Sequence, residues 1–152
     1  MLKHRVFIDR PPEAVWRFLA DPDHLPAWNR KIVEVEKLSF GDMDRGYRYQ
    51  VTYRMSDRVE SAAAEVTLFE PPARLEIRVT GDRMAPRGFA RESYRLRPKG
   101  GGTELIQEID LHESGMPGYM RWLVTLPQGA NRRRGSRYLT NLKRLVESAT
   151  TG

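Results

Sequence analysis

The chain has 152 residues, a length typical of one domain, with a net charge of +6 and an isoelectric point near 9.9. It contains no cysteine, which excludes disulfides, thiol catalysis and thiolate metal sites, and no apolar run approaches the ~18 residues that a transmembrane helix needs. The N-terminal MLKHRV lacks the apolar segment of a signal peptide, so we expect a cytoplasmic protein with a single domain over residues 1–152.

The N-terminal part predicts a strand followed by two short helices. Residues 2–8 alternate as a strand does, with one face formed by Leu2, His4, Val6 and Ile8. Pro12 suits the first position of a helix, where a missing N–H costs nothing. The apolar stripe of that helix is Val15, Phe18 and Leu19. Asp21 can cap a second short helix that begins at Pro22 and ends near Trp28.

Six further segments alternate with the period of two that strands have: 31–39, 47–55, 58–70, 74–80, 88–97 and 103–112. Short turns join them, which favours an antiparallel meander over βαβ units. The clearest segment has one face made of Tyr47, Tyr49, Val51, Tyr53 and Met55. The inward faces expected for the later segments are Ala62, Ala64, Val66 and Leu68; Leu75, Ile77 and Val79; Ala90, Glu92, Tyr94 and Leu96; and Leu105, Gln107, Ile109 and Leu111.

A long helix is predicted from about Met116 to the C-terminus. Two apolar stripes run along it, the first with Tyr119, Trp122, Leu123 and Leu126, the second with Tyr138, Leu142, Leu145 and Val146. Pro127 and Gly129 stand between the stripes and should kink or break the helix.

Several stretches carry a family resemblance: residues 8–16 (IDRPPEAVW) with 21–22 and 25–28, residues 69–75, residues 94–98 with 102–103, and residues 139–147. In these motifs and in the order of its elements, the chain resembles the START-like superfamily, in particular its polyketide cyclase/dehydrase-like and lipid-transfer branch. The resemblance implies an α+β helix-grip fold, with a curved antiparallel sheet of about six or seven strands wrapped around the long, kinked C-terminal helix. Relatives bind sterols, lipids, polyketides, plant hormones or quinones between sheet and helix, and a few catalyse cyclisation or dehydration.

The tyrosines of residues 47–55 have two interpretations. They can fill an ordinary core, or they can form the wall of a ligand pocket that offers apolar surface and a few hydroxyls. Each buried hydroxyl needs a partner, and three on one strand face exceed what a core requires. On the pocket interpretation, the residues that contact the ligand are Tyr49, Tyr53, Glu92, Tyr94, Gln107, Trp122 and Leu126.

Glu92 is the one candidate for catalysis. An inward carboxylate is costly without a partner, so Glu92 either pairs with an arginine, lies near an open rim, or serves as a ligand-binding or acid/base group. Gln107 is expected to be its hydrogen-bonding neighbour. A slip of one residue in strand register would turn both side chains outward.

Other features point to no cofactor. His4, His24 and His112 match no ligand spacing, so no metal is expected, and no nucleophile with a base is recognisable. The arginines at 132–134 and 137 form either a solvated helix face or a surface for an acidic partner or nucleic acid, with nucleic acid the less favoured of these. Residues 114–118 (SGMPG) form a plain connection or a gate.

The sequence therefore predicts a domain that binds a small hydrophobic ligand, without stable insertion into a membrane. The alternative is an enzyme, a polyketide cyclase, aromatase or dehydratase that uses Glu92 in the same cavity. A basic interaction module that uses residues 132–137 is a further alternative. A homodimer is left open.

Overall fold

The computed structural model describes residues 2–55, 58–81, 88–115 and 137–149. Within them, seven strands form one antiparallel sheet in the order β1-β7-β6-β5-β4-β3-β2. The strands are β1 (Leu2–Ile8), β2 (Ile32–Lys37), β3 (Arg48–Met55), β4 (Arg58–Glu70), β5 (Arg74–Gly81), β6 (Ala90–Lys99) and β7 (Gly102–Asp110). From β2 to β7 each strand pairs with the next along the chain, and β1 closes the far edge by pairing with β7.

The helices follow their predicted signals. Helix α1 (Pro12–Leu19) begins at a proline, and the 3-10 helix η1 (Pro22–His24) is capped by Asp21, whose Oδ1 accepts a 3.0 Å hydrogen bond from the Asp23 N–H. Helices α2 (Leu25–Trp28) and α4 (Arg137–Ser148) complete the described set. None of the described helices is long and apolar enough to cross a membrane.

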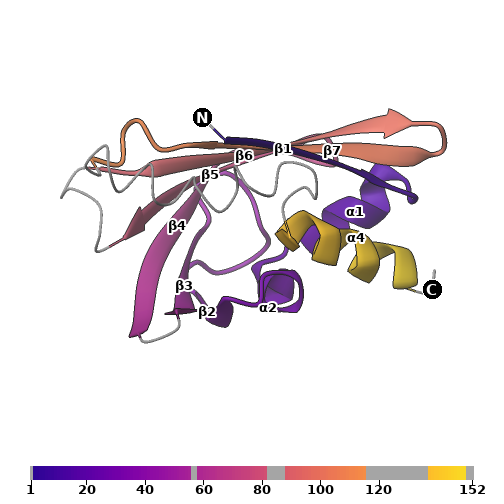
Figure 1. Cartoon of the computed structure of the whole chain (residues 1–152). Helices are drawn as coiled ribbons and strands as arrows, with labels where there is room; N and C mark the ends of the chain where they lie inside the picture. Colours follow the sequence, from indigo (N-terminus) through magenta and orange to yellow (C-terminus); the bar gives the residue numbers. More distant parts are fainter. Residues whose placement is uncertain (1, 56–57, 82–87, 116–136, 150–152) are drawn as a thin grey trace.

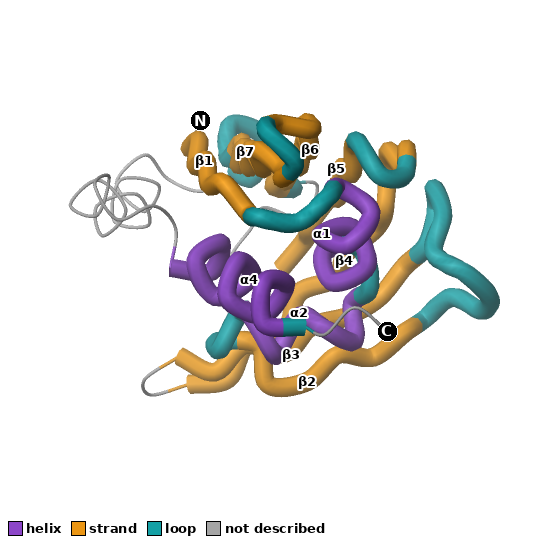
Figure 2. The backbone as a smooth tube through the Cα atoms, turned by 90° about the vertical axis from the view of Figure 1, so that its right-hand side faces the viewer, coloured by secondary structure: helices purple, strands orange, loops and turns teal. Residues whose placement is uncertain are grey.

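The sheet bends around the helices, which all lie on its concave side (Figures 1 and 2). Helix α4 lies against β1, α1 and α2. Its C-terminal end is fixed to the turn after β1, where the Asp9 N–H donates to Glu147 Oε1 at 2.8 Å and the Arg10 guanidinium donates to the carbonyls of Glu147 and Ala149. The two Arg10 bonds satisfy carbonyls that a helix end leaves without partners, and all three bonds hold α4 under the sheet.

The core lies between the concave face and the helices. Leu139, Leu142 and Val146 of α4 are completely or almost completely buried, as are Val15 of α1 and Leu105 of β7. Burying an aliphatic side chain of this kind stabilises the fold by about 1.5–3 kcal/mol relative to exposure. The amphipathic stripes of α1 and α4 therefore explain why both helices dock on the sheet.

The β6–β7 hairpin turns at consecutive glycines, as expected. Gly100 and Gly101 both have positive φ, which L side chains rarely adopt. Gly102 begins β7 so close to β1 that a Cβ there would lie 2.6 Å from the Ile8 carbonyl oxygen. A bare backbone at this point lets the hairpin pack against the first strand.

The predicted α+β helix-grip fold is confirmed, and the strand bounds agree with the prediction to within two residues at each end. The inward face predicted for β4 was wrong at Leu68. A β-bulge between Val66 and Leu68 shifts the β4 register, so Leu68 pairs with Glu76 and Phe69 pairs with the inward Leu75. Phe69 packs on the core and Leu68 turns to the outer face.

Part of the predicted C-terminal helix lies outside the described residues. This holds for Trp122 and Leu126, for the predicted kink at Pro127 and Gly129, and for the arginines at 132–134. Arg137, the first residue of α4, is exposed.

Candidate functional site

A cavity of about 300 Å³ lies between the concave face of the sheet and the helices. Its described lining is mostly apolar: Leu19, Ala20, Pro22, Leu25, Trp28, Ile32, Met43, Val51, Ala64, Val66, Leu75, Ile77, Val79 and Ile109. The polar lining residues are His4, Asn29, Lys31, Tyr49, Tyr53, Glu92, Tyr94, Gln107 and Tyr138. A concave, mainly apolar space with a few polar groups is typical of small-molecule sites.

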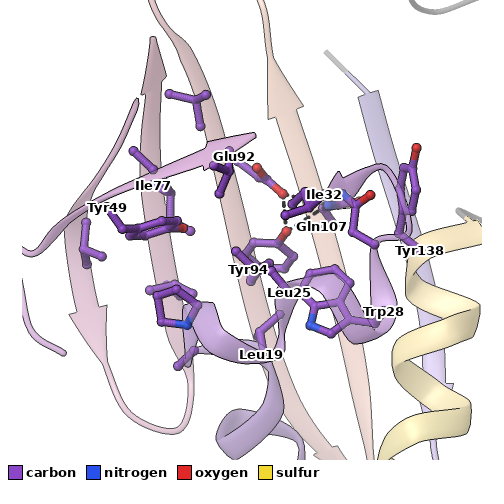
Figure 3. A pocket seen from close by; sticks show the side chains of 18 of the residues that line it. Leu19, Leu25, Trp28, Ile32, Tyr49, Ile77, Glu92, Tyr94, Gln107 and Tyr138 are labelled. Atoms are coloured by element: carbon purple, nitrogen blue, oxygen red, sulfur yellow. Dashed lines mark hydrogen bonds between the residues drawn. The ribbon is translucent and has the colours of Figure 1, made fainter. Parts of the chain in front are cut away.

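Three of the polar residues form a closed hydrogen-bonded cluster on β6 and β7 (Figure 3). The Tyr94 hydroxyl donates to Glu92 Oε1. Gln107 Nε2 donates to the same Oε1 at 3.0 Å and to the Tyr94 hydroxyl oxygen at 3.1 Å. We refer to Glu92, Tyr94 and Gln107 as the carboxyl cluster.

Strand register creates this cluster. Tyr94 and Gln107 are direct partners across β6 and β7, and Glu92 is two residues from Tyr94 on the same face of β6. His4 of β1 is the direct partner of Gln107 on its other side. The period of two therefore brings a carboxyl, a phenol, an amide and an imidazole to one side of the sheet.

Burial dominates the electrostatics of Glu92. It raises the pKa of the Glu92 carboxyl above the ordinary value of 4.5, and the hydrogen bonds from Tyr94 and Gln107 offset part of that rise. Glu92 keeps some accessible surface, yet it lines the cavity between sheet and helices, and desolvation there is the largest effect on its pKa. A carboxyl of this kind can gain or lose a proton closer to neutral pH than an ordinary one.

Tyr49 and Tyr53 of β3 face the carboxyl cluster across the cavity. The pKa of each phenol is raised, first by burial and then by the charge of Glu92, so both hydroxyls stay protonated. The Tyr49 hydroxyl points into the cavity (Figure 3). Both can donate a hydrogen bond to a bound molecule.

No metal centre is evident in the described part of the chain. There, no three His, Cys, Asp or Glu side chains lie close enough together to hold an ion.

Sequence comparison identifies the family. The family described as polyketide cyclase/dehydrase and lipid transport matches residues 2–147. The chain belongs to this family. Among curated proteins, no sequence matches it.

Solved structures similar to this member of the polyketide cyclase/dehydrase and lipid transport family share its fold. TTHA0849 from Thermus thermophilus has a TM-score of 0.74 at 18% identity, with 99% of each chain covered. Ara h 8.0201 has a TM-score of 0.72 at 12% identity, with 97% of each chain covered. DynU16, from the dynemicin biosynthetic locus, has a TM-score of 0.67 at 20% identity over 97% of this chain and 47% of its own. Identities this low show the fold alone.

The structure places most of the predicted site residues of this family member around one space. Tyr49, Tyr53, Glu92, Tyr94 and Gln107 all line the cavity. Of the three alternatives for Glu92, an arginine partner is not found among the described residues, where its hydrogen-bonding partners are Tyr94 and Gln107. The other two predicted contacts, Trp122 and Leu126, lie outside the described residues.

Most of the other lining residues were not predicted as part of the site, and among these are His4, Trp28, Lys31 and Tyr138. His4 could have been found, since its alternation with Val6 and Ile8 places it on the inward face of β1. Trp28, Lys31 and Tyr138 had no such signal, because their position depends on how α2 and α4 pack. The indole Nε1 of Trp28 is buried, and no group in the described chain accepts its hydrogen bond.

Proposed function

We propose that this protein binds a small, largely apolar ligand in the cavity between the sheet and the helices. The observation that carries the proposal is the cavity of about 300 Å³, whose apolar lining surrounds one hydrogen-bonded carboxyl cluster. An apolar wall supplies affinity by burial, and a small number of polar groups fix the orientation of a ligand. Membership of the polyketide cyclase/dehydrase and lipid transport family supports the same class of ligand.

The ligand-contacting residues that we propose are Tyr49, Tyr53, Glu92, Tyr94, Gln107, Trp122 and Leu126. Tyr49 and Tyr53 offer hydroxyl donors from β3, and the carboxyl cluster faces them from β6 and β7. Trp122 and Leu126 follow from the apolar stripe in the sequence.

A cavity-filling substitution tests the proposal. Ala64 lines the cavity and is 5% exposed, whereas its neighbour Ala63 points to the outer face of β4. We expect Ala64→Phe to weaken binding of the neutral probe 2-naphthalenemethanol at least about tenfold, because the new ring occupies the ligand's space. Ala63→Phe is the matched control and should leave binding unchanged. Isothermal titration calorimetry measures both.

Val66→Leu, a smaller filling change in the same wall, serves if Ala64→Phe does not fold. Native mass spectrometry of the purified protein searches in parallel for a retained small molecule. The proposal fails if nothing is retained and the probe does not bind the native protein. It also fails if Ala63→Phe and Ala64→Phe weaken binding equally.

A second candidate function is catalysis, and Glu92 is the observation that favours it. A cavity-lining carboxyl with a raised pKa suits general acid–base chemistry, and a neighbouring phenol can polarise a carbonyl oxygen. A cyclisation or dehydration of a poly-β-ketone substrate requires both actions. If the protein turns over such a substrate, Glu92→Gln should abolish turnover, a far larger effect than any change in the binding of 2-naphthalenemethanol. Unchanged turnover would remove Glu92 from the catalytic role.

A further inference from the structure

The two oxygens of the Glu92 carboxyl differ in the hydrogen bonds that they accept from the described residues. Oε1 accepts the bonds from both Tyr94 and Gln107. Within the described residues, Oε2 accepts no hydrogen bond, although an ionised carboxylate oxygen has room for about two. The Glu92 side chain is only partly buried and keeps some accessible surface. Since Glu92 lines the cavity, this oxygen is available to a bound molecule.

Among the described residues, few positive charges line the cavity beside this carboxyl. The basic side chains in the described lining are His4, which is half-buried on β1, and Lys31, which is exposed before β2. Neither forms a salt bridge with Glu92, and the other titratable groups that face the cavity are phenols, at Tyr49, Tyr53, Tyr94 and Tyr138. An ionised Glu92 is therefore a partly desolvated anion without a described cationic partner, which is a costly arrangement.

Aromatic rings surround the same space. Trp28 comes from α2, Tyr49 and Tyr53 from β3, Tyr94 from β6 and Tyr138 from α4. Figure 3 shows Tyr49, Trp28 and Tyr138 on the same side of the sheet as the carboxyl cluster, to which Tyr94 itself belongs. Ring faces carry partial negative charge and attract cations, and a group of rings with a carboxylate is a common receptor for ammonium groups. The rings and Glu92 thus favour the same charge in a ligand.

We propose that the natural ligand is an apolar amine, whose protonated nitrogen pairs with Glu92 Oε2 while its hydrocarbon part lies against the apolar wall. The inference rests on the proposed binding function and names its ligand class. The ammonium supplies a positive charge that Glu92 does not find among the described residues, and a carboxylate in the same place would be repelled by an ionised Glu92. The cavity therefore discriminates against fatty acids and other anionic lipids.

A matched series of naphthalene probes tests this ligand class: the cation of 2-naphthylmethylamine, the neutral 2-naphthalenemethanol, and 2-naphthylacetate, here the carboxylate anion of 2-naphthylacetic acid. All three share the apolar ring and differ in the charge of the polar end. At neutral pH we expect the amine to bind at least about tenfold more tightly than the alcohol, since a hydrogen bond between charged groups is worth more than a neutral one. The acetate should bind most weakly. Calorimetry on the intact chain gives the three dissociation constants.

Two variants locate the selectivity. Glu92→Gln keeps the shape of the side chain and removes its charge, so the amine should lose about tenfold more affinity than the alcohol does, and the preference for the amine should disappear. Glu108→Gln, on the outer face of β7, removes a charge away from the cavity and should have no effect. Calorimetry in buffers of different ionisation enthalpy should also show proton release when the amine binds below the folded pKa of Glu92, because the cation favours the ionised carboxyl.

The outcomes separate the two proposals. If the alcohol binds but the amine binds no better, or if Glu92→Gln leaves the preference unchanged, the amine inference is wrong and the binding function stands. Tightest binding of the acetate would also overturn it. If none of the three probes binds, the proposed function itself fails.

Discussion

The strand register imposes two opposing effects on the pKa of the Glu92 carboxyl. Its place on the inward face of β6 removes it from bulk water, and its neighbours Tyr94 and Gln107 donate hydrogen bonds that stabilise the charged form. Desolvation is the larger influence, so the carboxyl holds its proton to a higher pH in the folded protein than in the unfolded chain. This difference links protonation of Glu92 to stability.

We predict that Glu92→Gln changes the pH dependence of stability in one direction. At pH values below the unfolded pKa near 4.5, Glu92 is protonated in both states and has no net effect. As pH rises toward the folded pKa, the unfolded chain has lost its proton and the folded protein keeps it, so the free energy of unfolding of the native protein falls. The variant lacks this loss. Its stability relative to the native protein should therefore increase with pH.

Urea unfolding of both proteins over a pH series measures this difference, and all other titrating groups cancel in the comparison. Glu108→Gln, which removes a carboxyl from the outer face of β7, is the matched control for the loss of one acidic group. A difference that stays constant with pH would show that the folded and unfolded pKa values of Glu92 are equal.

At the scale of single residues, alternation along the chain was sufficient to predict that Glu92 and Gln107 point inward. It could not predict their bond to each other, because that depends on β6 and β7 being neighbours in a particular register. For the same reason alternation could not decide whether an arginine lies beside Glu92, and none of the described arginines does. The arginines of β6, such as Arg91 and Arg95, alternate with Glu92 and lie on the outer face.

Strand β4 shows what happens when an element departs from its simple period. The bulge after Val66 turns Leu68 outward and Phe69 inward, and the Phe69 ring then lies 5.4 Å from the ring of Trp16 on α1. Tilted aromatic pairs at this distance are favourable. The bulge thus attaches α1 to the end of the sheet.

Truncation of the two residues at the bulge should have unequal effects. We expect Phe69→Ala to lower the free energy of unfolding by about 2–3 kcal/mol, because it removes a ring that packs on the core. Leu68→Ala should cost less than about 1 kcal/mol, since Leu68 lies on the outer face. Urea denaturation of the two variants checks this. Equal losses would mean that the bulge does not place the two side chains on opposite faces in solution.

The bulge in β4 could not be predicted from the alternation of apolar and polar residues. Residues 66–69 (VTLF) contain no glycine or proline to mark an irregularity, and a regular strand would have buried Leu68 as readily as Phe69. The choice depends on Trp16, which comes from a helix more than forty positions earlier in the chain. In contrast, the β6–β7 hairpin carries its own signal in Gly100 and Gly101, and its position was predicted correctly.

At the scale of the whole molecule, element order and short motifs were sufficient for the fold, because helix-grip proteins share a distinctive succession of strands and helices. The cavity was less accessible to prediction. The lining residues from the sheet follow from alternation along the strands. Trp28 and Tyr138, which line the cavity from the helices, are positioned by the packing of α2 against α4. That docking involves a bond between the Asn141 side chain and the Trp28 carbonyl, which no local pattern encodes.

An apolar cavity in a core of this size lowers stability, because its walls lack the contacts that a filled core would have. A ligand restores those contacts and binds only the folded state, so it must stabilise the protein by mass action. At a concentration one hundred times the dissociation constant, 2-naphthalenemethanol should raise the free energy of unfolding by about 2.7 kcal/mol. For a domain of this length that corresponds to about 5–10 °C in melting temperature.

The same measurement on Ala64→Phe and Ala63→Phe links the cavity to this effect. Ala64→Phe places a ring where the ligand would lie, so its melting temperature should not respond to the probe. Ala63→Phe leaves the cavity open and should show the full shift of the native protein. An equal shift in all three proteins would place probe binding elsewhere on the surface. A shift that disappears in Ala64→Phe alone would mean that the space left unfilled by the core is the space that the ligand uses.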